Sequence, residues 1–210
     1  METKTQKNFT TNDKSIRVAL RKVLEKKLET FRAKGSNAEI FEELGVQHGT
    51  ARIDFAIVNG IMHGYEIKSD RDTLERLPDQ IKEFSTVFDE ITLIVGKRYL
   101  YEAVHMIPDW WGIMLAKTNG DQVILQTIRE PEKNKEQVGL SIARLLWREE
   151  ALHMLEERNK AGGLRYKPRE FIYEKLADEL DTETLMGQVS ALLVSREGWR
   201  SDQQLATNGG

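Results

Sequence analysis

The sequence predicts an α/β core, built from a helix, three antiparallel strands, a second helix and a further strand, followed by a helical C-terminal extension. Two observations support this prediction. Apolar residues recur at helical spacing on either side of three short runs that are rich in β-branched and aromatic residues. Beyond residue 130 the composition changes to a charged linker followed by helical patterns, so we expect a core at 1–130 and an extension at 131–210.

The first half of the core follows from local patterns. A helix is expected over residues 15–33, where apolar residues lie three or four positions apart and Gly35 provides a stop. Three consecutive runs separated by glycine-containing turns predict antiparallel strands at 39–44, 52–58 and 62–69. A basic outer face is expected on the helix, because lysine and arginine occupy its polar positions.

The second half of the core is also predicted from local sequence patterns. A helix is expected over residues 72–88, with its main part starting near Leu77, because Pro78 is favoured in a first helical turn. The continuous apolar run at 91–95 predicts a buried strand. A short helix at 99–106 and a strand after residues 110–112 should complete the core. The extension should form helices at 140–157, 169–180 and 182–195, the last of them capped by Thr182.

Composition excludes several classes of protein. The chain has 210 residues and no cysteine, which rules out disulfide scaffolds, cysteine nucleophiles and cysteine-held zinc or iron–sulfur sites. No apolar run reaches the roughly 18 residues of a membrane helix, and no apolar signal-peptide core is present, so we expect a cytoplasmic protein without a membrane partner. The net charge is −3, and acid is concentrated at residues 35–130, where sixteen acidic residues outnumber nine basic ones.

Three polar residues on the predicted hairpin are the candidates for a functional site. Glu66 and Lys68 lie two apart on one strand, so their side chains share a face of the sheet. Asp54 lies on the preceding strand. A three-residue loop at 59–61 would place Asp54 directly across from Glu66, whereas a two-residue Asn-Gly turn would put the two carboxylates on opposite faces. We therefore predict an odd-length loop or a bulge.

The same register predicts how the hairpin faces are used. The face with Ile53 and the aromatic residues is the better core face. The face with the acidic residues carries Ala56 and Gly64 in its middle, and these small residues should leave room for the backbone of a substrate.

Two carboxylates beside a lysine suit Mg²⁺ or Mn²⁺, because such ions take oxygen ligands and complete their shell with water and phosphate oxygens. Asp54 and Glu66 are expected as ligands, and the Ile67 carbonyl is placed to be another. Lys68 would orient the attacking water or stabilise the transition state of phosphodiester cleavage. From spacing alone, a surface hairpin with a cross-strand salt bridge is an equal alternative.

The placement of these residues resembles the PD-(D/E)-x-K (restriction-endonuclease-like) nuclease superfamily. Asp54, Glu66 and Lys68 stand at its motif positions, and Ile53 replaces the proline of the superfamily name. The run at 51–84 and the later DWWGI segment look like a largely uncharacterised bacterial and phage family within that superfamily. The resemblance implies a restriction-endonuclease-like core and metal-dependent cleavage of DNA.

The resemblance also implies further site residues. Members often add a glutamate from the first helix or an early strand; we favour Glu43, and the other candidates are Glu25, Glu29, Glu39 and Glu42. Gln80, followed by Phe84, is similar to a glutamine–aromatic element of RecB-like nucleases and could bond to the metal-bound water or the substrate. Arg76 lies one turn before Gln80, within reach of a phosphate.

A second basic segment lies in the extension. Its basic residues are Lys160, Arg165, Lys167 and Arg169, and the turn that holds them could contact phosphates or be an ordinary solvated loop. The sequence thus predicts a Mg²⁺- or Mn²⁺-dependent DNA endonuclease, serving DNA repair, recombination or phage and host defence. The alternative is a catalytically inactive protein of the same fold that binds nucleic acid or a protein partner. A homodimer, or a partner that supplies DNA targeting, is compatible with the weak overall basicity.

Overall fold

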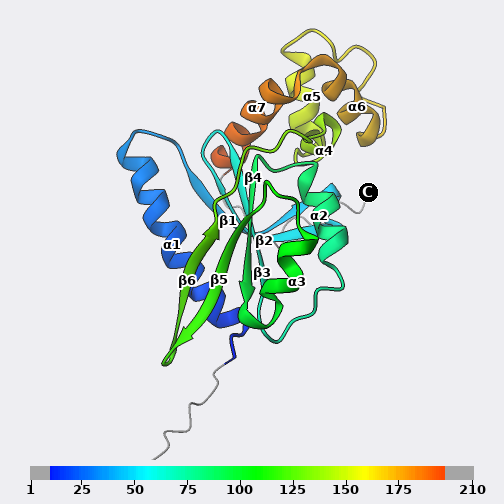
Figure 1. The fold of residues 1–210 in the computed structure, drawn as a ribbon. Helices are drawn as coiled ribbons and strands as arrows, with labels where there is room; N and C mark the ends of the chain where they lie inside the picture. Colours follow the sequence, from blue (N-terminus) through cyan, green and yellow to red (C-terminus); the bar gives the residue numbers. More distant parts are fainter. Residues whose placement is uncertain (1–9, 197–210) are drawn as a thin grey trace, which may run out of the picture.

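A six-stranded mixed sheet forms the centre of the molecule in the computed structural model, which describes residues 10–196 (Figure 1). The strands follow one another in sequence order across the sheet. They are β1 (Glu39–Val46), β2 (Ala51–Val58), β3 (Met62–Lys68), β4 (Glu90–Gly96), β5 (Gly112–Asn119) and β6 (Gln122–Arg129). Pairing is antiparallel among β1, β2 and β3, parallel from β3 through β4 to β5, and antiparallel between β5 and β6. The predicted α/β class is confirmed in this sense.

Seven α-helices cover or extend the sheet within the described residues. They are α1 (Asp13–Ala33), α2 (Leu77–Ser85), α3 (Leu100–Met106), α4 (Gly139–Ala143), α5 (Arg148–Glu156), α6 (Arg169–Glu179) and α7 (Thr182–Ser195). Figure 1 shows α1 along one side of the sheet, α2 and α3 on the other side, and α4–α7 gathered at one end. No helix within residues 10–196 combines the length and apolarity that crossing a membrane requires.

Helix α1 is fixed at its start and along one stripe. Asn12 Oδ1 accepts a hydrogen bond from the Ser15 backbone N–H, and Ser15 Oγ accepts one from the Asn12 N–H, which together form a capping box. The apolar stripe then packs against one face of β2, β3 and β4. The buried residues of this cluster include Ile16, Leu20, Leu24, Phe55, Ile57, Tyr65 and Ile67. Because this contact fixes the helix on the sheet, the polar residues of its first turns lie over the first half of β2.

A larger apolar cluster fills the opposite face. It joins α2 and the sheet to α4–α7, so that Val58 and Met62 share one cluster with Leu145 and Met186. The predicted extension therefore packs on the core through apolar side chains. The domain boundary at residue 130 stays a prediction.

Most of the expected elements are confirmed, and three details are wrong. The single helix expected at 140–157 is two, α4 and α5, separated by residues 144–147. Asp181, not Thr182, caps α7, because its side chain accepts a hydrogen bond from the Thr184 N–H at 2.9 Å. Strand β6 was not predicted; its residues are mostly exposed or half-buried, so it lacks the strong apolar run that marks β4.

The room expected at Ala56 and Gly64 is absent. A Cβ on Gly64 would lie 2.3 Å from Ile53 Cδ1 and 3.2 Å from Phe88, so this face is packed core. Ile53 shares a cluster with Ala56, although residues three apart in a regular strand point to opposite faces. Side chains along β1 and β2 stop alternating regularly between the two faces of the sheet at Glu43, which lies opposite Asp54 in register. Glu43 takes a backbone φ of 51° there. The open space of the structure lies at the other side of this irregularity, next to the first residues of β2.

Candidate active site

A cleft of about 980 Å³ opens where β2 begins and β3 ends. Its walls come from the first turns of α1, the η1 turn (Gln47–Gly49) region before β2, the loop after β3, and α2. The lining includes all four sequence-predicted catalytic side chains, Asp54, Glu66, Lys68 and Gln80, and also Ile67, Glu43 and Arg76. The fold therefore brings together residues that lie on four different elements.

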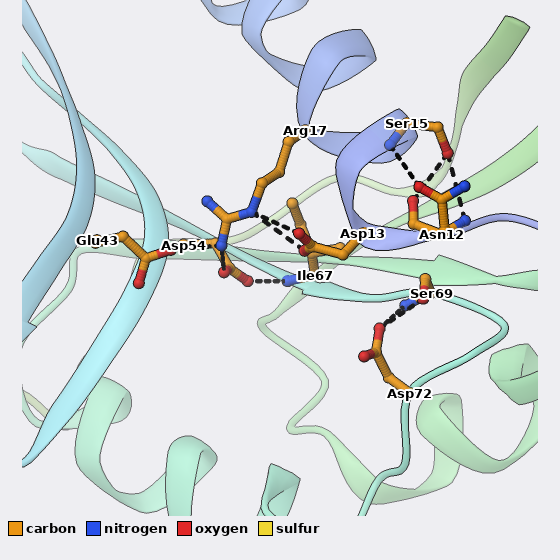
Figure 2. Close-up of polar contacts among 9 residues, drawn as sticks. All are labelled: Asn12, Asp13, Ser15, Arg17, Glu43, Asp54, Ile67, Ser69 and Asp72. Carbon is orange, nitrogen blue, oxygen red and sulfur yellow. Dashed lines mark hydrogen bonds and ion pairs between the residues drawn. The ribbon is translucent and has the colours of Figure 1, made fainter.

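The hairpin has the predicted odd-length loop. Val58 pairs with Met62, which leaves residues 59–61 as a three-residue connection, and the ladder continues to the Phe55–Tyr65 pair. Counting one position further places Asp54 opposite Glu66. Regular pairing stops there, and Asp54 Oδ2 accepts a hydrogen bond from the Ile67 N–H at 2.7 Å (Figure 2). The Asp54 carboxylate thus replaces a backbone acceptor at the point where the two strands separate.

Glu66 is the most enclosed acid of the site. Its Oε1 accepts hydrogen bonds from Lys68 Nζ and from Gln80 Nε2, both at 2.6 Å. Glu66 is 2% exposed and Lys68 is 4% exposed. The second oxygen of Glu66, Oε2, is buried without a hydrogen-bond partner, and so is Gln80 Oε1. Buried polar oxygens are nearly always paired, so these two atoms mark a place for a missing donor or cation.

Arg17 on α1 closes the other side of the cleft (Figure 2). Its Nη2 contacts Asp54 Oδ1 and Glu43 Oε1, and its Nε donates to Asp13 at 3.0 Å. Among the candidate glutamates of the first helix and strand, Glu43 is the one that lines the cleft. The others lie outside its lining: Glu25, Glu29, Glu39 and Glu42. Of these, Glu39 pairs with Arg32 at 3.1 Å, and Glu42 pairs with Arg21.

Burial and mutual repulsion perturb both central acids. Burial raises the pKa of Asp54 to about 7, and the nearby charge of Glu66 adds to this, while Arg17 and the Ile67 N–H act in the opposite direction. Burial also raises the pKa of the Glu66 carboxyl, against the attraction of Lys68 and the hydrogen bond from Gln80. Two carboxyls in this state favour either a shared proton or an added cation.

The donor set fits a hard cation held by few protein ligands. Asp54 and Glu66 supply carboxylate oxygens, the Ile67 backbone supplies a carbonyl, and Glu66 Oε2 lacks a partner. Mg²⁺ commonly uses one or two carboxylates and keeps several waters. Within residues 10–196 no three or more His, Asp or Glu side chains form a group able to hold a metal. Glu43 lines the same cleft, and its role as a further ligand stays a prediction.

The sequence pattern of the family Bacteriophage P4 protein cII matches residues 7–208. The chain belongs to this family. Protein cII of Enterobacteria phage P4 is 32% identical over 95 residues, which cover 45% of this chain and 36% of the phage protein. The chain thus matches little more than a third of its relative's length. SPO1766, a protein of unknown function from Silicibacter pomeroyi, aligns with a TM-score of 0.37 at 17% identity, over 66% of this chain and 89% of that one. Neither relative's name states an activity.

The second basic segment of this cII-family protein lies away from the cleft. Lys160 pairs with Glu179 at 3.2 Å, and Arg165 pairs with Glu156 at 2.9 Å. Lys167 lies 5.3 Å from the centre of the Phe171 ring. None of the four predicted residues, Arg169 included, is among the residues that line the cleft. Their contact with nucleic acid stays a prediction that the cleft does not support.

Sequence reasoning missed three arginines that the cII-family chain brings to the cleft. Arg17 lies on α1, Arg52 lies two residues before Asp54, and Arg71 lies in the loop after Lys68. The proximity of Arg52 and Arg71 to the motif was the available signal. Arg17 offered none, because its link to Asp54 spans 37 positions and depends on how α1 crosses the sheet.

Proposed function

We propose that this cII-family protein is a metal-dependent phosphodiesterase that hydrolyses DNA, with a restriction-endonuclease-like core. The single observation that carries the proposal is the convergence of Asp54, Glu66 and Lys68 in one cleft, with Glu66 Oε2 left unpartnered. The phage P4 relative supports a role in phage biology, and the choice of DNA over RNA comes from the superfamily resemblance.

Asp54, Glu66 and the Ile67 carbonyl would hold Mg²⁺ or Mn²⁺. When bound, such an ion neutralises charge on a scissile phosphate and lowers the pKa of an attacking water. Lys68 donates one hydrogen bond to Glu66, which leaves further ammonium protons to orient that water or to stabilise the charged transition state. Gln80 holds Glu66 from α2, and its unpartnered Oε1 can accept a hydrogen bond from the water.

Arginines on the cleft walls supply binding sites for phosphates. Arg52, Arg71 and Arg76 line the cleft, and within residues 10–196 none of these three side chains forms an ion pair or a side-chain hydrogen bond. The loop that carries Arg71 is held on both sides. Asp72 accepts hydrogen bonds from the Ser69 N–H and hydroxyl at 2.7 and 2.6 Å, and Asp70 accepts one from the Arg98 N–H at 2.9 Å. Guanidinium groups placed in this way fit a phosphodiester backbone.

The test is cleavage of supercoiled, linear and single-stranded DNA by purified protein in Mg²⁺, Mn²⁺ or EDTA. Asp54→Asn, Glu66→Gln and Lys68→Met should abolish metal-dependent cleavage. Matched controls are Asp109→Asn and Lys117→Met, which remove the same charges from exposed residues outside the cleft. Cleavage that survives in all three cleft variants would sink the proposal. Binding without cleavage, equal in wild type and variants, would support the inactive binding protein instead.

A further inference from the structure

Arg17 holds the same carboxylates that a cation would need. Its Nη2 contacts both Asp54 and Glu43, and the other oxygen of Asp54 is bonded to the Ile67 N–H (Figure 2). Both oxygens of Asp54 are therefore occupied in this structure. Each oxygen keeps a second lone pair, but a guanidinium in contact with Oδ1 repels a divalent cation at the same carboxylate. Because the Ile67 N–H is fixed by the strand, Arg17 is the partner that can leave.

Arg17 also has a partner that is independent of Asp54. Its Nε donates to Asp13 at 3.0 Å, one turn earlier on α1, and this contact does not involve Asp54. The Arg17 side chain is 24% exposed, so its guanidinium has access to the solvent of the cleft. The guanidinium carbon lies 5.5 Å from the centre of the Phe55 ring, so this aromatic face is a further contact of the group. If Asp54 is released, Asp13 remains as a partner on the same helix.

We propose that Arg17 and a divalent cation are alternative partners of Asp54, so that cation binding displaces the guanidinium from this carboxylate. Arg17 is then a positioning residue. Without a cation it holds Asp54 and Glu43 together and compensates their charge. With a cation bound, it is free to interact with Asp13 or with a phosphate in the cleft. This inference rests on the proposed metal site, and it adds that Arg17 regulates how readily a cation occupies that site.

A consequence is that Arg17 lowers the apparent affinity for the cation. If Arg17 must leave before the cation binds, the apparent affinity for the cation falls in proportion to the fraction of molecules in which Asp54 is free of Arg17. A charge-assisted hydrogen bond in a partly buried position corresponds to about a tenfold factor. Removal of the guanidinium should therefore tighten cation binding by about tenfold.

The experiment is titration of the full chain with Mn²⁺ in the absence of DNA, by isothermal calorimetry and by the electron paramagnetic resonance signal of free Mn²⁺. Arg17→Met removes the guanidinium and keeps an unbranched stem. Arg21→Met is the matched control. Arg21 lies one turn further along α1, 5.9 Å from the centre of the same Phe55 ring, and pairs with Glu42 outside the cleft. Both variants lose one positive charge at nearly the same place.

We expect Arg17→Met to bind Mn²⁺ about tenfold more tightly than the wild type and Arg21→Met to differ by less than about threefold. Arg17→Lys, which keeps the charge but not the forked guanidinium, should fall between them. Thermal unfolding of each variant shows whether it is folded. If Arg17→Met binds Mn²⁺ as the wild type does, or more weakly, or if no variant binds Mn²⁺, the inference is wrong.

These results separate the inference from the proposed function. Tighter binding by Arg17→Met in a protein that cleaves no DNA would uphold the Arg17 role and refute the nuclease. Metal-dependent cleavage with unchanged Mn²⁺ affinity in Arg17→Met would refute the Arg17 role and uphold the nuclease.

Discussion

The raised pKa of Asp54 makes the stability of the metal-free protein depend on pH. Burial and the charge of Glu66 raise the pKa of this carboxyl to about 7 in the folded protein, against an ordinary value of 3.8. The folded state therefore holds the proton more tightly than the unfolded state. The stabilisation from this group is fully present below about pH 4, and it is lost as the pH rises through about 7.

The size of the effect follows from the same two values. A difference of about three pH units, at about 1.4 kcal/mol per unit, corresponds to about 4 kcal/mol of folding free energy between pH 4 and pH 8. The side chain of Asp54 is 17% exposed, so little of this is lost to screening by solvent. Asparagine at this position still accepts the hydrogen bond from Ile67 but does not titrate. Asp54→Asn should remove this part of the pH dependence.

The assay is urea unfolding of wild type and Asp54→Asn in EDTA at intervals from pH 4 to pH 8. We expect the free energy of unfolding of the wild type to fall relative to that of the variant by up to about 4 kcal/mol as the pH rises. Saturating Mg²⁺ should restore part of the wild-type stability at pH 8, because a cation binds the ionised carboxylates. Parallel curves for the two proteins across the whole range would refute the assigned environment of Asp54.

Three further predictions concern packing, substrate and capping. Gly64→Ala should cost about 1–3 kcal/mol of stability in chemical denaturation, since the added Cβ would meet Ile53 at 2.3 Å; a neutral result would mean that this face is loosely packed. Arg71→Ala should weaken binding of duplex DNA in Ca²⁺ and reduce the slope of log affinity against log salt by about 1, whereas Arg165→Ala should match the wild type; equal slopes would remove Arg71 from the phosphate site. Asp181→Ala should lower stability by about 1 kcal/mol through loss of the α7 cap, and an unchanged unfolding midpoint would contradict that assignment.

The core of the site was predictable because it depends on strand parity. Glu66 and Lys68 share a face by their spacing, and the apolar flanks of Asp54 imply that this acid has partners. The requirement that Asp54 meet Glu66 then fixed an odd loop length, which the Val58–Met62 pairing bears out. These inferences need only local periodicity.

The remaining features depend on tertiary contacts. Periodicity could not show that the alternation of β1 and β2 changes phase at Glu43 and Asp54, so the packing of Ile53 against Gly64 was assigned to the wrong face. The position of Arg17 over Asp54 depends on the angle at which α1 crosses the sheet. The pairing of Arg165 with Glu156 was equally hidden, because it forms only when the C-terminal helices fold.

The central claim is that Asp54 and Glu66 hold a divalent cation beside Lys68. The most direct test is an anomalous-difference map from crystals of the protein soaked in Mn²⁺. The account predicts a peak at about 2.1 Å from oxygens of Asp54, Glu66 and the Ile67 carbonyl, with Arg17 withdrawn from Asp54. A map with Mn²⁺ bound elsewhere and none between these residues would contradict it.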